Sequence, residues 1–309
     1  MKKYFKYLFY KIPAVRKMRA SIDQLESDTA LFSYNSCFPP GHYYSPIVNV
    51  DEVKTRANEI WKEPAPDQIE GIDLNADNQL ALLDAFSSYY KALPFQADVS
   101  AKLRYYFEND FYSYTDGITL YSILRQFKPA RVIEAGSGFS SALMLDVKQL
   151  FPELKTAFTF IEPYPERLNS LLKDEDRQHV LLLEKGIQQV ELSYFEQLAE
   201  NDILFIDSTH VSKTGSDVNY IIFEILPRLK SGVIIHIHDI FYPFEYPKNW
   251  VLQGRNWNET YLLHAFLMYN KNFEILFFAD YLHQKHSAAF STLPLFYKNT
   301  GGCLWLKKL

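Results

Sequence analysis

Titratable side chains stand at the ends of several short apolar runs in this sequence. The run "ILFIDSTH" ends in Asp207 and His210, another run ends in Glu162, and a third ends in the adjacent pair His238 and Asp239. The carboxyl ends of parallel strands form the ligand-binding edge of open α/β sheets. If these runs are strands, their carboxylates and imidazoles meet at one edge, where they could bind a cation or transfer protons.

A glycine turn follows the first apolar run. "RVIEAG" continues into "SGFSS", which gives Gly136 and Gly138 with Ser137 between them. Glycines let the backbone turn tightly and let a ligand approach it closely. Glu162 follows Gly138 by 24 residues, at the end of the next run, where an acid can accept hydrogen bonds from ribose hydroxyls. This pattern predicts a ligand that contains a ribose.

A negative charge beside the turn restricts the type of ligand that can bind there. Glu134 precedes Gly136 by two residues, so its carboxylate would repel a pyrophosphate and would suit a cationic ligand. S-adenosylmethionine carries an ammonium and a sulfonium in addition to its ribose. It therefore fits both Glu134 and Glu162.

Four segments, in this order and spacing, resemble a known family: "VIEAGSGFSS", "FTFIEP", "DILFIDSTH" and "LKSGVIIHIHDI". They are similar to the class I S-adenosylmethionine-dependent methyltransferases, and most of all to the branch with catechol and macrolide-sugar O-methyltransferases. The resemblance covers roughly residues 116–309. It implies a set of cofactor-binding residues: Glu134, Gly136, Ser137 and Gly138 for the methionine portion, Glu162 for the ribose, Gln188 near the adenine, and Asp116 and Tyr121 as a cover.

The resemblance also implies where the chemistry takes place. Metal-dependent members of this branch bind Mg²⁺ with acids after the fourth and fifth strands, which correspond to Asp207 and Asp239. His210 corresponds to the histidine of the "IDGSH" pattern in macrolide-sugar O-methyltransferases. The resemblance implies that this histidine acts as the general base. His238 stands where a carboxylate is commoner, and histidine is a less natural ligand for Mg²⁺. Either Asp207 and Asp239 bind a divalent cation, or the enzyme is metal-free and a histidine removes the proton.

The elements that must position these residues have the pattern of a parallel sheet. Apolar runs at 131–136, 158–163, 179–186, 203–208 and 232–239 are separated by stretches with helical spacing. Runs at 273–280 and 302–308 are expected to form an antiparallel pair at the sheet edge. The sequence thus predicts an α/β fold, a Rossmann-like, doubly wound, mostly parallel seven-stranded sheet with an antiparallel last strand.

Two domains are expected along the chain. Residues 1–115 would form a mainly helical and irregular extension, and residues 116–309 would form the methyltransferase domain. Within the extension, the proline- and aromatic-rich segment 38–47 is either a lid over the sheet edge or a packed linker. The loop 242–259, directly after Asp239, has the aromatic and polar mix of a substrate-binding loop.

Composition excludes several classes of protein. The 309 residues are 48% hydrophobic and 22% charged, which is typical of a folded globular chain. The net charge of −5 argues against nucleic acid as a partner. The two cysteines, Cys37 and Cys303, lie far apart and have no metal-ligand spacing, so a reducing, cytoplasmic location is expected.

The first 20 residues differ in charge from the rest. They carry seven Lys or Arg and no acid, so the remainder of the chain sums to −12 (−5 minus +7). This segment is either a basic, aromatic-bearing element that contacts the inner face of an anionic membrane peripherally, or an N-terminal helix that is frayed or packed on its domain.

The sequence therefore predicts an S-adenosylmethionine-dependent O-methyltransferase that acts on a hydroxyl of a small molecule, a sugar or glycan above all. His236, two residues before His238, is expected to be a core histidine with a satisfied hydrogen bond. Two alternatives stay open at this point. One is an NAD(P)-dependent oxidoreductase on a Rossmann-like sheet, and the other is a catalytically inert adaptor with the methyltransferase fold.

Overall fold

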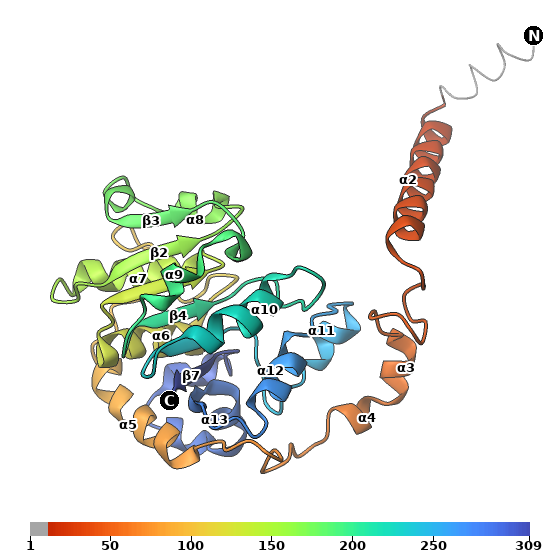
Figure 1. Cartoon of the computed structure of the whole chain (residues 1–309). Helices are drawn as coiled ribbons and strands as arrows, with labels where there is room; N and C mark the ends of the chain where they lie inside the picture. Colours follow the sequence, from red (N-terminus) through yellow and green to blue (C-terminus); the bar gives the residue numbers. More distant parts are fainter. Residues whose placement is uncertain (1–11) are drawn as a thin grey trace, which may run out of the picture. The chain divides into compact units, whose positions relative to one another are not determined.

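The chain divides into two compact units, Met1–Arg56 and Ala57–Leu309. The computed structural model describes residues 12–309. The first unit contains α2 (Pro13–Asn35) and α3 (Val50–Thr55), which Figure 1 draws in red and orange. Pro13 stands at the first residue of α2, where its missing N–H is not needed for an intrahelical hydrogen bond. The segment 38–47 lies between these two helices.

The second unit is built around a seven-stranded sheet with the order β3-β2-β1-β4-β5-β7-β6. Strands β1 to β5 pair in parallel, and β7 lies antiparallel between β5 and β6. The predicted fold class is confirmed, including the antiparallel pair. The strands are β1 (Arg131–Ala135), β2 (Ala157–Ile161), β3 (Val180–Leu183), β4 (Ile203–Ile206), β5 (Ile234–Ile237), β6 (Phe273–Phe278) and β7 (Leu304–Lys308).

Helices form two layers around this sheet (Figure 1). Helices α5 to α8 pack against one another in succession, and α9 and α10 pack with the short helices η2 and η3. The helices of the second unit are α4 (Ala57–Ile60), α5 (Ala76–Tyr90), α6 (Tyr114–Phe127), α7 (Phe139–Leu150), α8 (Glu166–Leu171), α9 (Leu192–Glu196), α10 (Asp217–Tyr220), α11 (Lys248–Leu252), α12 (Glu259–Leu267) and α13 (Ala279–Lys285). The short 3-10 and π segments are η1 (Asp176–Gln178), η2 (Ile187–Gln189), η3 (Ile221–Ile225), η4 (Leu226–Arg228), η5 (Ser287–Phe290) and η6 (Pro294–Lys298).

The predicted domain boundary lay at residues 115 and 116, whereas the compact unit that holds the sheet begins at Ala57. The reason is packing, since α5 lies against both α6 and β6. Leu83 and Phe86 of α5 are buried in the common core. Residues 57–115 therefore contribute to the same hydrophobic core as the sheet.

The two central strands β4 and β5 are buried along their whole length. Such continuous burial explains why their sequences are unbroken apolar runs rather than alternating ones. No helix in the part of the chain from residue 12 onward has the length and apolar character needed to cross a membrane.

The turn after β1 comes very close to the end of β4. Gly136 has φ of +84°, and a Cβ atom there would lie 1.6 Å from the carbonyl oxygen of Asp207. A side chain at this position would push the two strand ends apart. Gly136 is therefore required both by its left-handed backbone and by the contact with Asp207.

Replacing Gly136 by alanine should destabilise the protein strongly. We expect a loss of about 3 kcal/mol in the free energy of unfolding, because overlap with backbone adds to the cost of a positive φ. Gly215→Ala is a matched control, since Gly215 also has a positive φ, +72°, but no atom lies within 4 Å of the position that its Cβ would occupy. Urea unfolding of both variants checks this; equal losses would show that the contact with Asp207 carries no cost.

Candidate functional site

A cavity of about 610 Å³ lies at the carboxyl ends of β1, β4 and β5. This volume is within the range of small-molecule sites. The structure brings together eight of the residues predicted from the sequence to form the site. They are Gly136, Ser137, Gly138, Glu162, Asp207, His210, His238 and Asp239.

His210 is at the centre of the charged side of the cavity. Its Nε2 lies 3.4 Å from Asp207 Oδ1 and 3.5 Å from Asp239 Oδ2, and its Nδ1 lies 2.9 Å from Glu259 Oε2. The backbone N–H groups of Asn258 and Glu259 donate to the carbonyl oxygen of His210, at 3.0 and 3.1 Å. The first turn of α12 therefore fixes both the backbone and the ring of His210.

Two residues of this cluster have unusual backbone geometry. His210 has φ of +58° and Asp239 has φ of +57°. Non-glycine residues adopt the left-handed region at a cost, and such residues are concentrated at functional sites. The chain bends at both positions so that their side chains turn toward the same point.

Charges within the cluster shift one another's pKa. Burial alone would lower the pKa of His210, but the hydrogen bonds and charges of Asp207 and Glu259 raise it well above its usual value. Burial would raise the pKa of Asp207, but His238 and His210 together lower it. Burial also raises the pKa of Asp239, against the opposing effect of the two histidines. The imidazolium form of His210 thus compensates the nearby carboxylates.

A buried polar layer lies behind the cluster. The ring of Tyr112 lies 5.2 Å from that of His238, and Asp116 accepts a hydrogen bond from the Gly302 N–H at 3.0 Å. Burial would lower the pKa of His238, but Asp207, Asp239 and Asp116 raise it. This layer holds His238 in a negative environment on the side away from solvent.

The glycine side of the cavity offers backbone and hydroxyl groups. Glu162 accepts hydrogen bonds from the N–H of Ser137 at 3.0 Å and of Tyr164 at 2.9 Å. A Cβ on Gly138 would lie 3.2 Å from the Arg167 side chain. Among residues 12–309, four polar atoms of residues that line the cavity are buried and have no hydrogen-bond partner. They are Tyr112 OH, Ser137 Oγ, Ser208 Oγ and His238 Nδ1.

These features fit the cofactor expected from the sequence. Buried polar atoms without partners are rare in native proteins, and those at a cavity wall are available to a ligand. The narrow turn at Gly136 leaves open backbone beside Glu162, where a ribose could bind. The carboxylates at the opposite wall could hold a cation.

Four predicted cofactor residues do not line the cavity. Glu134 is fully buried, and its carboxylate accepts hydrogen bonds from the hydroxyls of Ser140 and Ser141 at the start of α7. Asp116 lies in the buried layer behind His238. The Tyr121 hydroxyl donates to the Ala92 carbonyl oxygen, so that side chain belongs to the core.

The fourth residue is Gln188, which borders a separate surface pocket with Glu191 and Tyr220. Glu134 and Asp116 therefore support the site from behind, whereas Tyr121 and Gln188 have no contact with this cavity.

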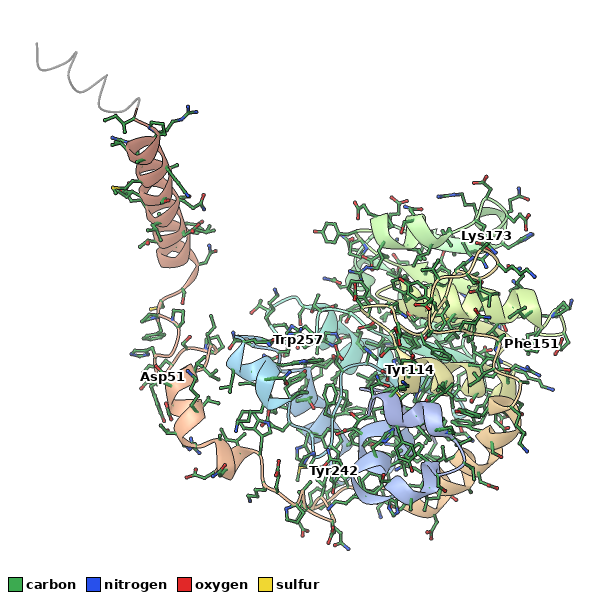
Figure 2. The ribbon with its side chains drawn as sticks, turned by 180° about the vertical axis from the view of Figure 1, so that it is seen from behind. Asp51, Tyr114, Phe151, Lys173, Tyr242 and Trp257 are labelled. Carbon is green, nitrogen blue, oxygen red and sulfur yellow. The ribbon has the colours of Figure 1, made fainter. Side chains whose placement is uncertain are left out.

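Sequence reasoning missed several residues at the cavity wall or directly behind it. Glu259 is buried and orients His210, and the Trp257 ring lies 4.5 Å from the His210 ring. Figure 2 shows Trp257 among the side chains near α11 and α12. Arg255 stacks on Trp250, with its guanidinium 4.2 Å from the ring centroid. The loop 242–259 was predicted to bind substrate, and it contains Trp250, Arg255, Trp257 and Glu259. The sequence did not reveal the pairing of Glu259 with His210, because the two residues are 49 positions apart.

The α6 and α8 side of the wall was missed as well. Phe111 and Tyr112 precede α6, and the Arg167 guanidinium lies 3.7 Å from the Phe111 ring centroid. No residue type in these segments marked them as part of a site.

The prediction for His236 was correct for its burial but wrong for its hydrogen bond. Neither ring nitrogen has a partner within the described residues, and the ring stacks on Phe205 at 3.8 Å.

Comparisons with known proteins agree with this geometry. Residues 133–240 match the family model described as a methyltransferase domain. The chain is 36% identical over 186 residues to an uncharacterized protein of Archaeoglobus fulgidus, and the match covers 58% of this chain and 81% of the relative.

Solved structures also align with the chain, though loosely. The SAH-bound methyltransferase PaMTH1 of Podospora anserina has a TM-score of 0.41 and 15% identity, covering 89% of this chain and 99% of that one. The O-methyltransferase TomG of Streptomyces achromogenes, in complex with SAM, has a TM-score of 0.39 and 15% identity, covering 84% of this chain and 96% of that one. These scores are too low for any conclusion about function.

The sheet order, the cavity at its carboxyl edge and the family match together define a methyltransferase with a Rossmann-like fold. The chain belongs to the class I S-adenosylmethionine-dependent methyltransferases, in the same family as the Archaeoglobus protein. The match to a methyltransferase domain supports S-adenosylmethionine as the cofactor. The match to a methyltransferase domain argues against the oxidoreductase that the sequence left open, and turnover measurements distinguish an active enzyme from the inert adaptor.

The buried carboxyl of Glu134 should make stability depend on pH. Burial raises its pKa from 4.5 to about 8, against the effect of the serine hydroxyls. An acid with a raised pKa binds its proton more tightly in the folded state. Its contribution to the free energy of unfolding is therefore greatest below pH 4.5 and is lost as the pH rises to about 8. Glu134→Gln should therefore gain on the order of a few kcal/mol relative to wild type between pH 5 and pH 8.

Urea unfolding of the cofactor-free protein at several pH values measures this difference. Glu166→Gln, at an exposed position on α8, is the control and should show no such trend. A stability difference between Glu134→Gln and wild type that stays constant with pH would contradict the assignment.

Proposed function

We propose that this methyltransferase transfers the methyl group to a hydroxyl oxygen of a sugar or glycan. The observation that carries the proposal is the position of His210, whose Nε2 faces the cavity between Asp207 and Asp239. A hydroxyl is a poor nucleophile until its proton is removed. A histidine held in one orientation beside the glycine turn suits that task.

The proposed role of His210 depends on Glu259. A carboxylate that accepts the Nδ1 proton fixes the tautomer, so that Nε2 is the nitrogen that faces an acceptor. Trp257 and the α12 backbone hold the same ring in place. S-adenosylmethionine supplies an activated methyl group on sulfur, and the protein has to align the acceptor oxygen and accept its proton.

A divalent cation is a second possibility for activating the hydroxyl. One ligand atom each from Asp207, His238 and Asp239 can lie within 4.8 Å of one another. Two carboxylates and an imidazole fit a divalent ion, although the imidazole favours a transition metal over Mg²⁺. The unpartnered Nδ1 of His238 is consistent with this donor set. We propose Asp207 and Asp239 as the principal ligands.

A second cavity supports an acceptor larger than a single small ring. It has a volume of about 720 Å³ and adjoins the first across an aromatic wall, in which the Phe241 ring lies 5.2 Å from the Trp250 ring. Trp61, Tyr242 and Gln284 also border it. Aromatic faces with nearby amide and carboxylate groups suit a polyhydroxylated ligand.

Removal of the Glu162 carboxylate should weaken cofactor binding. We expect Glu162→Ala to lose about 2–4 kcal/mol of binding free energy for S-adenosylmethionine, since a charged acceptor for the ribose hydroxyls is lost. Glu162→Gln keeps one acceptor oxygen and should lose less. Glu166→Ala is the control. Calorimetry that finds the same affinity in Glu162→Ala and wild type would rule out this role for Glu162.

Changes at His210 and Glu259 should affect turnover and not cofactor affinity. His210→Ala should lose about 10²–10⁴-fold in turnover, and Glu259→Gln should lose roughly 10-fold because the ring is held less firmly. Since carboxylates raise the pKa of His210, its base form increases as the pH rises above neutral, and the wild-type rate should rise with it.

Chelation separates the two ways of activating the hydroxyl. If Asp207 and Asp239 bind a divalent ion, EDTA should suppress turnover and leave S-adenosylmethionine affinity nearly unchanged. If His210 acts alone, EDTA should have no effect. Turnover that survives EDTA, His210→Ala and Asp207→Asn alike would show that the chemistry lies elsewhere.

A further inference from the structure

The helix α2 carries four apolar residues and one threonine at a regular spacing along one face. Val15, Met18, Ile22, Leu25 and Thr29 are separated by three, four, three and four residues. These are the a and d positions of a heptad repeat, which forms the seam of a coiled coil. Within the first unit, Met18, Ile22 and Leu25 are exposed, at 66%, 48% and 65%. Across the described side chains of α2, none is buried.

The charges of α2 are divided between its two halves. The first half carries Arg16, Lys17 and Arg19, and the second half carries Asp23, Glu26 and Asp28. Figure 2 shows the described side chains projecting around this single continuous helix. A second α2 in parallel would place like charges at the same end. A second α2 in antiparallel orientation would place the basic half of each helix beside the acidic half of the other.

We propose that α2 binds the α2 of a second copy of this chain as an antiparallel two-stranded coiled coil. In the symmetric register, Ile22 packs opposite the partner's Leu25, and Met18 packs opposite the partner's Thr29. Antiparallel pairs place an a position opposite a d position, and both of these layers obey that rule.

The flanking positions of the heptad agree with the same register. Arg19 and Glu26 both occupy position e, and e positions face each other across an antiparallel pair. Arg19 then lies beside the partner's Glu26, and this contact occurs twice by symmetry. Arg19 also lies 3.8 Å from Asp23 in its own helix, so the contact between helices joins an existing charge cluster.

The contact is short, so we expect a weak, concentration-dependent dimer. A helix of 23 residues is long enough to be stable once its apolar face is covered. Sedimentation velocity of the full chain at about 1 μM and about 50 μM should show a shift from monomer to dimer. Ile22→Glu and Leu25→Glu should remain monomeric at both concentrations, with unchanged affinity for S-adenosylmethionine.

Charge reversal tests the orientation. Arg19→Glu and Glu26→Arg should each weaken the dimer at least 5-fold, by like-charge repulsion, and the double variant should recover most of the affinity. In a Cys37→Ser background, an equimolar mixture of Met18→Cys and Thr29→Cys chains should form a disulfide-linked dimer under mild oxidation. Each cysteine variant by itself should cross-link much less, because identical positions lie far apart in an antiparallel pair.

Several results would overturn the proposal. A wild-type chain that stays monomeric at about 50 μM would do so, as would a dimer unaffected by Ile22→Glu. Efficient cross-linking of Thr29→Cys alone would show a parallel pair. A monomer that sediments with phosphatidylserine vesicles at low salt would show that a membrane, one of the two alternatives for residues 1–20, is the true partner of this region.

Discussion

Two carboxylates at neighbouring strand ends are held around one imidazole, and the rest of the site depends on this arrangement. Because β4 and β5 are adjacent and parallel, Asp207 and Asp239 reach the same sheet edge. Their like charges repel each other unless a positive charge lies nearby. His210 supplies that charge when it is protonated, and Glu259 fixes its ring from the opposite side at 2.9 Å. The loop after β4 and the start of α12 therefore have to meet at this point.

The two sides of the cavity offer different chemistry. The side next to β1 consists of backbone, small hydroxyl groups and Glu162, because Gly136 approaches Asp207 so closely that no side chain fits. The side next to β4 and β5 consists of titratable groups. Methyl transfer needs a bound donor and an acceptor whose proton can be removed, and a site divided in this way can hold both.

The buried groups behind the cavity stabilise the geometry at some cost. Glu134 and Asp116 are both buried, and burial raises the pKa of each. Each is nevertheless hydrogen-bonded, Glu134 to two serine hydroxyls and Asp116 to a backbone N–H. These bonds hold the start of α7 and the start of β7 at the edge of the sheet, so residues expected to touch the cofactor instead support the surface that would bind it.

The sequence by itself determined the strands, their mostly parallel pairing and the set of polar residues at their ends, because periodicity and strand ends are local features. Unbroken apolar runs predicted β4 and β5, and the glycine turn followed from Gly136 and Gly138. Only the tertiary structure decided that Glu259 orients His210, that Trp257 covers it and that Tyr121 lies in the core. These contacts join positions far apart in the chain, and a side chain's direction depends on packing that spacing does not encode.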